Sequence, residues 1–363
     1  MTSATVVLAV SGHGFGHAVR CAEVAKALVC RGARVVVRSD APRWLFSDDV
    51  EWMSSPGWPL DIGVAQHDGL ELDIDETRRR WHAFEAEFEA HTDAEAQLLQ
   101  GERADIVLGD IPPLAFAAAA RAGLPSFGLT NFTWDWIYAA WPDFEPIVAR
   151  IREAYAQADA LLRLPLCGPC DAFARIEDVP LVTRRATRTR ASVRMELGLP
   201  VSAPVVLLSF GGFAARGLDV ASLGRWREYF FVLAPPSNEL AASPANVRVL
   251  NETPPDYVSL LAACDVVVTK PGYGIVADCL ANRVAVLFTD RGPFREYDVL
   301  AAALPRLGRA RYVPRDRLLA GEIGADLDML LASDAAWTEQ PMNGADRVAE
   351  RVLDQVTIEQ NLG

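Results

Sequence analysis

The stretch TVVLAVSGHGFGHAVRCAEVAKALVC, residues 5–30, decides the fold. Residues 5–10 are an apolar run rich in β-branched side chains, which predicts a buried strand, and residues 18–30 carry apolar side chains at helical spacing. A second strand is predicted at 33–38. Strand, turn, helix and strand form one βαβ unit, the building block of parallel sheets.

The turn of this unit, SGHGFGH at 11–17, holds three glycines and two histidines. Glycines let a backbone turn sharply and bring N–H groups and a helix N-terminus close to an anion. An imidazole can take a proton from a substrate hydroxyl near neutral pH. His17 is therefore a candidate general base, with helix capping or packing by His13 and His17 as the alternative.

As a dinucleotide-binding fingerprint the turn is incomplete, because its third glycine would fall at His17. Asp40 does follow the second strand, where an acid that binds ribose would lie. An NAD-dependent oxidoreductase is thus one alternative function.

Strand-like and helix-like segments alternate along the chain, which predicts an α/β fold with largely parallel sheets. We expect a single amphipathic helix at 76–99 and the end of the first sheet near 160–164. Residues 204–210 begin a second series of strands. The predicted parts are a first Rossmann-like domain at 1–165, completed by a C-terminal helix at 343–363, a linker at 166–190 and a second Rossmann-like domain at 191–342.

The second half repeats the pattern of strand followed by glycine turn. SFGGF at 209–213 is followed by Arg216, and TKPGYG at 269–274 leads into a helix that contains Asp278. Backbone N–H groups at 272–275 suit a diphosphate, and Asp278 suits a ribose diol, unless it only stabilises the helix N-terminus. Two glycine turns facing one another across a cleft between the two domains predict a nucleotide-sugar site.

Four further residues concern the site. Asp110 follows a predicted strand, so it is a candidate to orient the His17 imidazole, with a cap as the alternative. Trp134 lies in an aromatic segment that forms either a stacking wall for an acceptor or ordinary packing. Asp135 is a second candidate base. Lys270 is one of only two lysines.

Composition limits the function classes. With 51% hydrophobic and 23% charged residues the 363-residue chain is globular, and its net charge of −13 argues against a nucleic-acid partner. There is no apolar run long enough for a membrane helix and no basic leader, so we expect a cytoplasmic protein without membrane spans. The lone CxxC at 167–170 lacks further ligands for zinc, and no metal is expected.

The chain resembles the two-domain GT-B glycosyltransferases, and in particular the glycosyltransferase-like N-terminal region of plant arabinokinases. More distantly it is similar to the transferase that adds N-acetylglucosamine to the peptidoglycan precursor. The resemblance spans roughly residues 6–320. It rests on GHGFGH at 12–17, TNFTWDWIY at 130–138, DVPLVTRR at 178–185, FGG at 210–212 and KPGYGIVADCL at 270–280. The kinase domain of the arabinokinases is not expected, because the chain ends soon after its last helix.

The resemblance implies roles for individual residues. His17 would lie on the acceptor side, and Asp278, which stands where glutamate is usual, would hold the ribose. Glu296 partly matches an acid that grips the donor sugar. Together with the residues argued from the sequence itself, the predicted acceptor-binding residues are His13, Gly14, Phe15, Gly16, Trp134 and Asp135. The predicted donor-binding residues are Gly211, Gly212, Arg216, Lys270, Gly272, Tyr273, Gly274, Ile275, Asp278 and Glu296.

The predicted function is an inverting, metal-independent transfer of a hexosyl or N-acetylhexosaminyl group from a nucleoside-diphosphate sugar, of the UDP type, to an acceptor hydroxyl. The nucleotide sugar would be a co-substrate, and no other cofactor is expected. The alternatives are a nucleotide-sugar epimerase of the same fold and a non-catalytic protein that binds nucleotide sugars. The acceptor, the sugar and the oligomeric state stay open.

Overall fold

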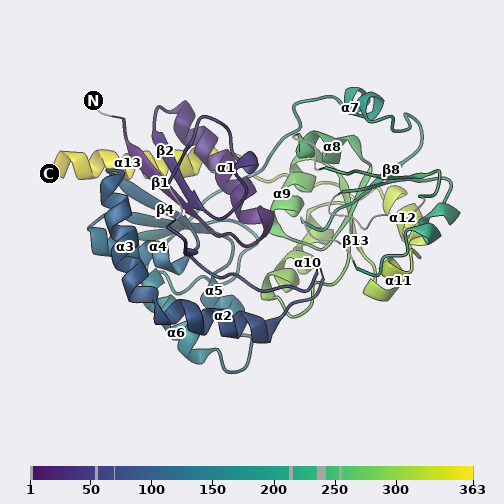
Figure 1. The fold of residues 1–363 in the computed structure, drawn as a ribbon. Coiled ribbons are helices and arrows are strands. Elements are labelled where there is room, and N and C mark those ends of the chain that lie inside the picture. Colours follow the sequence, from purple (N-terminus) through teal and green to yellow (C-terminus); the bar gives the residue numbers. More distant parts are fainter. Residues whose placement is uncertain are drawn as a thin grey trace. The chain divides into compact units, whose positions relative to one another are not determined.

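The computed structural model describes residues 3–53, 56–68, 70–211, 216–234, 243–252 and 256–362. The chain divides into two compact units (Figure 1). Unit 1 consists of Met1–Ala65, Asp73–Thr183 and Gln340–Gly363. Unit 2 consists of Gln66–Leu72 and Arg184–Glu339.

Unit 1 is a parallel sheet with helices packed around it. Its described strands form a seven-stranded sheet in the order β3-β2-β1-β4-β5-β6-β7. The strands are β1 (Thr5–Val10), β2 (Arg34–Ser39), β3 (Glu51–Trp52), β4 (Ile106–Asp110), β5 (Ser126–Thr130), β6 (Ala160–Arg163) and β7 (Ile176–Asp178). The helices are α1 (Gly14–Cys30), the 3-10 turn η1 (Arg43–Leu45), α2 (Ile74–Ala86), α3 (Phe88–Gly101), α4 (Pro113–Ala122), α5 (Trp134–Tyr138), α6 (Glu145–Tyr155) and α13 (Gly344–Leu362).

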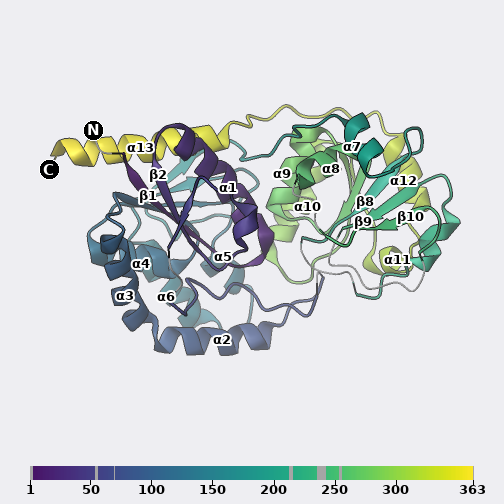
Figure 2. The ribbon, with the colours of Figure 1, turned by 45° about the horizontal axis from the view of Figure 1, so that its top comes forward.

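The central strands are apolar because helices cover both faces of the sheet. All six residues of β1 and all five of β4 are buried, which is the pattern of parallel strands in a doubly wound sheet. The C-terminal helix α13 contacts α1 and β4, and Figures 1 and 2 show it in yellow beside the purple N-terminal segment. The last helix of the chain therefore completes the unit that the first strand begins.

Unit 2 repeats this architecture. Its described strands form a six-stranded parallel sheet in the order β10-β9-β8-β11-β12-β13. They are β8 (Val205–Leu208), β9 (Phe230–Leu233), β10 (Val247–Val249), β11 (Val266–Thr269), β12 (Ala285–Phe288) and β13 (Ala310–Tyr312). The helices are α7 (Arg190–Glu196), the 3-10 turn η2 (Ala221–Arg225), α8 (Tyr257–Ala263), α9 (Tyr273–Asn282), α10 (Arg295–Leu307), α11 (Arg315–Leu319) and α12 (Gly324–Leu331).

The single helix expected at 76–99 is two helices, α2 and α3. The break falls at Glu87, whose dihedral angles of φ −106° and ψ 2° end the first helix. Phe84 and Phe88, on either side of the break, are both buried, and their rings meet edge to face at 5.6 Å. The apolar stripe continues through the break, so the sequence pattern alone did not reveal it.

The predicted end of the first sheet and the predicted linker at 166–190 are both wrong. Residues 176–178 form β7, which pairs with β6 and extends the first sheet. From Arg184 onward the stretch belongs to unit 2, where the Arg184 guanidinium pairs with Asp278. The stretch is therefore divided between the two units. Its short strand β7 pairs with β6 in unit 1, and Arg184 pairs with Asp278 in unit 2.

A short segment from the first half of the sequence, Gln66–Leu72, belongs to unit 2. Gln66 and Leu72 form an isolated antiparallel bridge, and the Asp68 carboxylate accepts hydrogen bonds from the backbone N–H groups of Leu70 and Glu71. Leu70 is 1% exposed and is part of the hydrophobic core of unit 2. Burial of Leu70 anchors this segment.

Replacement of Gly344 with alanine should destabilise the attachment of α13. A Cβ atom at this position would collide with the carbonyl oxygen of Pro180 and lie 2.7 Å from that of Leu181. Backbone atoms cannot rotate away, so we expect the free energy of unfolding to fall by about 1 to 3 kcal/mol, as measured by urea denaturation.

Gly101→Ala is the matched control for that substitution. A Cβ atom at Gly101, the last residue of α3, has no described atom within 4 Å, and alanine is the better helix former. We expect the control to leave stability unchanged or to raise it slightly. Equal stabilities for the two variants would contradict the close contact at Gly344.

Candidate functional site

The strand orders place one topological switch point in each sheet. In unit 1 the chain leaves β1 toward β2 on one side, whereas β4 lies on its other side. In unit 2 β8 and β11 have the same relation. Ligands of such sheets bind outside the carboxyl ends of the strands at this point. The residues there are 11–17 and Asp110 in unit 1, and Ser209–Gly211 and Lys270–Gly272 in unit 2.

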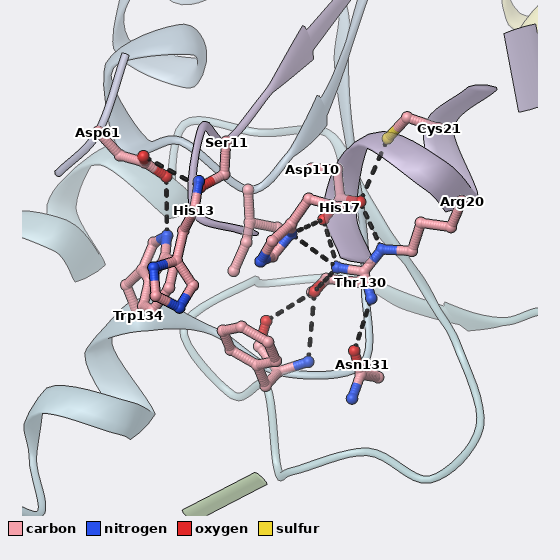
Figure 3. A network of polar contacts seen from close by, with 12 residues as sticks. Ser11, His13, His17, Arg20, Cys21, Asp61, Asp110, Thr130, Asn131 and Trp134 are labelled. Carbon is pink, nitrogen blue, oxygen red and sulfur yellow. Dashed lines mark hydrogen bonds and ion pairs between the residues drawn. The ribbon is translucent and has the colours of Figure 1, made fainter. Parts of the chain in front are cut away.

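At the switch point of unit 1, His17 and Asp110 form a pair. His17 lies in the first turn of α1, and Asp110 is the last residue of β4. His17 Nδ1 is 2.9 Å from Asp110 Oδ1, and the two side chains are 6% and 0% exposed (Figure 3). The sequence-based expectation that Asp110 contacts the His17 imidazole agrees with this geometry.

Asp110 is held on its other side by Arg20, one turn after His17 in α1. Arg20 Nη2 donates to Asp110 Oδ1 at 2.5 Å and Arg20 Nε donates to Oδ2, so the guanidinium spans both oxygens. The Cys21 thiol donates to Oδ2 at 3.2 Å. Burial would raise the pKa of Asp110, but Arg20 and His17 together lower it to about 2. Asp110 is therefore a carboxylate at neutral pH.

Both polar contacts of the His17 ring in the described part of the chain use Nδ1, one with Asp110 and one with Arg20 Nη2 at 3.0 Å. Phe132 and Trp134 flank the ring at centroid distances of 5.4 and 6.0 Å. When Nδ1–H donates to Asp110, Nε2 presents a lone pair. An imidazole held in this way can accept a proton from a hydroxyl.

A second buried carboxylate, Asp61, was not predicted from the sequence. Its Oδ1 accepts from Ser11 Oγ at 3.0 Å, and its Oδ2 accepts from Trp134 Nε1 at 2.9 Å (Figure 3). Burial raises the pKa of Asp61 to about 6, although Ser11, His17 and Trp134 oppose the rise. Asp61 thus ties the turn after β1 to the start of α5.

Asp61 should make stability depend on pH in the mildly acidic range. Its folded pKa of about 6 lies above the value of about 3.9 for an unfolded chain, so the folded state binds the extra proton. Its contribution is fully present below pH 4 and is lost as the pH rises to 6, by about 3 kcal/mol.

Asp61→Asn removes this titration. We expect the free energy of unfolding of the variant, relative to that of the wild type, to increase by about 2 kcal/mol between pH 4 and pH 7. Urea denaturation at each pH measures both values. A difference that is constant across this range would contradict the raised pKa.

The other predicted residues of the first glycine turn surround His17. His13 Nδ1 accepts from the Val64 N–H at 3.2 Å, and its ring lies 6.4 Å from that of His17. Gly14 has a φ of 66° and starts α1. Cβ atoms at Gly14 or Gly16 would meet no described atom within 4 Å, so the backbone there is open to close approach. Phe15 meets Trp44 edge to face at 5.6 Å.

Trp134 and Asp135 are buried, and their contacts are typical of residues that stabilise the fold. Trp134 is 1% exposed and stacks on Tyr138 at 5.7 Å, as the packing alternative predicts. Asp135 is equally buried and pairs with Arg152 at 2.7 Å. Among the described residues, Asp135 forms its ion pair with this arginine rather than with either histidine of the turn, which favours His17 over Asp135 as the base.

At the switch point of unit 2, the predicted diphosphate-binding residues Gly272, Tyr273, Gly274 and Ile275 form the N-terminus of α9. Gly272 is the N-cap and has no side chain with which to cap the helix. A Cβ atom at Gly272 would have no described atom within 4 Å. Backbone N–H groups at a helix N-terminus and the helix dipole can stabilise an anion.

Lys270 is a buried lysine close to this helix end. Burial lowers the pKa of Lys270 well below its usual range, Arg291 adds to the effect, and Asp68 and Glu296 oppose it. Glu296 accepts from Arg291 Nη1 at 2.8 Å. The candidate donor-sugar residue Glu296 thus lies in one cluster of ionisable side chains with Arg291 and Lys270. Asp68, from segment 66–72, is a member that the sequence did not reveal.

The other predicted donor residues are placed as follows. Gly211 has a φ of 71°, and a Cβ atom on it would lie 4.0 Å from Lys270 Cε. The glycine turn after β8 therefore packs against the aliphatic part of the Lys270 side chain. Arg216 is exposed. Gly212 lies outside the described residues.

Asp278, the predicted ribose ligand, is 2% exposed and is engaged by Arg184. Its Oδ1 accepts from the Arg184 backbone N–H at 3.0 Å, and its Oδ2 accepts from the guanidinium at 3.1 and 2.5 Å. A ribose hydroxyl would therefore have to share the carboxylate with this arginine. Nothing in the sequence spacing revealed the pair, because 94 residues separate its members.

Among the described residues, no group of three or more His, Cys, Asp or Glu side chains is arranged to hold a metal ion. Burial raises the pKa of both cysteines of the CxxC motif, that of Cys170 to about 12, so both are thiols. No helix in the described part of the chain is long and apolar enough to cross a membrane.

Comparison with solved structures defines the class of fold. The glycotransferase of kitacinnamycin superposes with a TM-score of 0.65 at 20% identity, covering 98% of this chain and 100% of the other. MurG of Acinetobacter baumannii gives 0.58 at 15%, covering 97% and 100%. The glycosyltransferase VinC in complex with dTDP gives 0.59 at 16%, covering 97% and 95%. The chain has the two-domain GT-B glycosyltransferase fold, as predicted.

Comparison with curated protein sequences identifies a relative with higher sequence identity. The chain is 32% identical over 367 residues to L-arabinokinase of Arabidopsis thaliana, and the match covers 96% of this chain. The chain spans 34% of the length of that relative. The similarity to arabinokinases predicted from the sequence is thereby confirmed. No protein-family model matches the chain.

Proposed function

We propose that the protein is a glycosyltransferase that moves a sugar from a nucleoside-diphosphate sugar to an acceptor hydroxyl. The observation that carries the proposal is the contact between His17 Nδ1 and Asp110 at 2.9 Å. This contact orients the imidazole and leaves Nε2 as the proton acceptor. The fold shared with glycosyltransferases supports the same reaction class.

In the proposed reaction, His17 Nε2 takes the proton of the acceptor hydroxyl. At the same time the hydroxyl oxygen forms a bond to the anomeric carbon of the donor sugar. The bond from that carbon to the diphosphate oxygen breaks, and the nucleoside diphosphate leaves with the electron pair. Attack from the opposite side inverts the anomeric configuration. Asp110 stays ionised and stabilises the imidazolium that forms.

The donor would bind at the switch point of unit 2. The backbone N–H groups at the N-terminus of α9, after Gly272, would hold the diphosphate, with Lys270 as countercharge and Asp278 toward the ribose. VinC, of the same fold, was solved with dTDP, which supports a nucleoside diphosphate as part of the donor. The proposal extends to a hexosyl or N-acetylhexosaminyl group, a UDP-type donor, and a reaction without metal.

Binding should be detectable as thermal stabilisation by nucleotides. A ligand at about 100 times its Kd stabilises the native state by about 2.7 kcal/mol, which raises the Tm of a domain of this size by several degrees. We expect such a shift with UDP, dTDP or GDP in a fluorescence melting screen. The Lys270→Met variant should lose most of the shift, because it lacks the cation.

The second lysine provides the control. Lys26 is 52% exposed and pairs with Glu23 on α1, so Lys26→Met should keep the full shift. Lys270→Met should itself fold, because methionine is apolar and replaces a buried cation. An unchanged shift in Lys270→Met would exclude Lys270 from donor binding.

The pair between Asp278 and Arg184 favours one second candidate, a protein that binds nucleotide sugars without transfer. If the carboxylate is held by Arg184, as its three hydrogen bonds suggest, the donor lacks a ribose ligand that a transferase would use. Nucleotide-sugar binding without product across a broad acceptor panel would support this candidate. Release of an altered sugar without any acceptor would instead indicate an epimerase.

A further inference from the structure

Arg20 is the feature of the unit 1 site that the proposed reaction does not use. Its side chain is 3% exposed, and it spans both oxygens of Asp110. It is fixed from the far side as well, because Nη1 donates to Asn131 Oδ1 at 2.7 Å and Nη2 donates to Thr130 Oγ1 at 3.1 Å. A guanidinium in such a network cannot move away from the His17–Asp110 pair without breaking several hydrogen bonds.

The geometry sets up a competition at His17 Nδ1. This atom lies 2.9 Å from Asp110 Oδ1 and 3.0 Å from Arg20 Nη2. A carboxylate only accepts and a guanidinium only donates. If Asp110 takes the contact, the ring proton is on Nδ1 and Nε2 is a base. If Arg20 takes it, the proton is on Nε2, which then cannot accept another.

The charges of Asp110 and Arg20 act on the His17 ring in opposite directions. Asp110 carries one negative charge and Arg20 one positive charge at nearly the same distance from the ring, so their effects on an imidazolium largely cancel. Among the described residues, the other titratable groups near His17 are His13 in the turn after β1, Asp61, whose pKa burial raises to about 6, and Cys21 on α1, which donates to Asp110. Without Arg20, His17 would face a carboxylate with no countercharge.

We propose that Arg20 is a positioning residue that sets the tautomer of the pair. It holds Asp110 as an acceptor for Nδ1–H, which leaves Nε2 of His17 to take a proton, and it offsets the charge of Asp110. Since Arg20 Nη2 already donates to Asp110 Oδ1 and Thr130, the guanidinium is satisfied without His17 Nδ1. The catalytic part of this inference rests on the proposed function, whereas the protonation of the ring does not.

The test is a titration of the imidazole by NMR, using protein labelled with ¹⁵N-histidine. The chain has five histidines, so His17 is assigned by comparison with His17→Gln. In the wild type at pH 8 we expect the tautomer with the proton on Nδ1. The opposite tautomer would overturn the proposal without any substitution at Arg20.

Substitutions at Arg20 measure the charge effect. In Arg20→Met the titration midpoint of His17 should rise by about 1 to 3 pH units, the effect of an unbalanced neighbouring carboxylate. Arg20→Lys keeps the charge and should stay near the wild-type midpoint. A midpoint in Arg20→Met equal to that of the wild type would show that Arg20 is merely structural.

Two further measurements separate the possible failures. Near-ultraviolet circular dichroism shows whether each variant is folded, and if Arg20→Met does not fold, the wild-type tautomer and Arg20→Lys still decide the proposal. If a transfer assay is in hand, the acidic limb of its pH profile should move with the NMR midpoint. A shifted midpoint in a protein that transfers no sugar would refute the proposed function and leave the role of Arg20 intact.

Discussion

His17→Ala should lower kcat for sugar transfer by two to four orders of magnitude, the usual contribution of a positioned general base. In the proposed reaction the imidazole takes the acceptor proton, and its Nδ1 lies 2.9 Å from Asp110 Oδ1. Alanine leaves a small cavity in unit 1, and the proposed donor-binding residues of unit 2 are unchanged in this variant. The measurement is kcat at saturating donor, together with donor affinity by calorimetry.

The control for this variant is His82→Ala, because His82 is an exposed residue of α2. It should keep wild-type kcat and donor affinity. Full turnover in His17→Ala, with donor affinity unchanged, would refute the assignment of His17 as the base. Loss of donor affinity in His17→Ala would instead point to damage beyond proton transfer.

Asp110→Asn should impair both stability and activity. The amide cannot balance the buried Arg20 guanidinium, and breaking a buried ion pair from one side costs about 3 to 5 kcal/mol. An amide in place of the carboxylate also fails to hold the proton of His17 on Nδ1, a change that lowers kcat about 10⁴-fold in catalytic triads. Denaturant unfolding and kcat at saturating donor are the two measurements.

The pH dependence of stability provides an independent check on Asp110. Its folded pKa of about 2 lies below the unfolded value of about 3.9, so its contribution is present above pH 4 and is lost as the pH falls to 2, by about 2.5 kcal/mol. The variant should lack this acid dependence. The double variant Arg20→Met, Asp110→Leu should recover much of the stability, because an apolar pair leaves no unbalanced charge. A single variant as stable as the wild type would contradict the buried pair.

The switch points and their loops were predictable from the sequence. The apolar runs at 5–10 and 266–269 are buried strands, and both are followed by glycine turns at the carboxyl edges of parallel sheets. Asp110 could be proposed as the partner of His17 because it ends a neighbouring strand. Arg20 carried a usable signal as well, since it follows His17 by one helical turn and so lies on the same face.

Other parts of the site carried no local signal. Asp61 reaches Ser11 over 50 residues and Trp134 over 73 residues of sequence, so only the folded chain brings them together. The assignment of residues 66–72 to unit 2 depends on the burial of Leu70 in a core formed by residues beyond 200. The strands β3 and β7 have two and three residues, too few to form an apolar pattern.

The central claim is that His17 and a nucleotide-sugar donor act in one reaction. The most direct test is quantitative mass spectrometry of the products formed by the wild type and by His17→Ala from nucleotide sugars and a panel of acceptor alcohols. We predict equal amounts of nucleoside diphosphate and glycoside for the wild type and a yield lower by at least about 100-fold for the variant. Equal yields from the two proteins, or a changed sugar released without an acceptor, would contradict the claim.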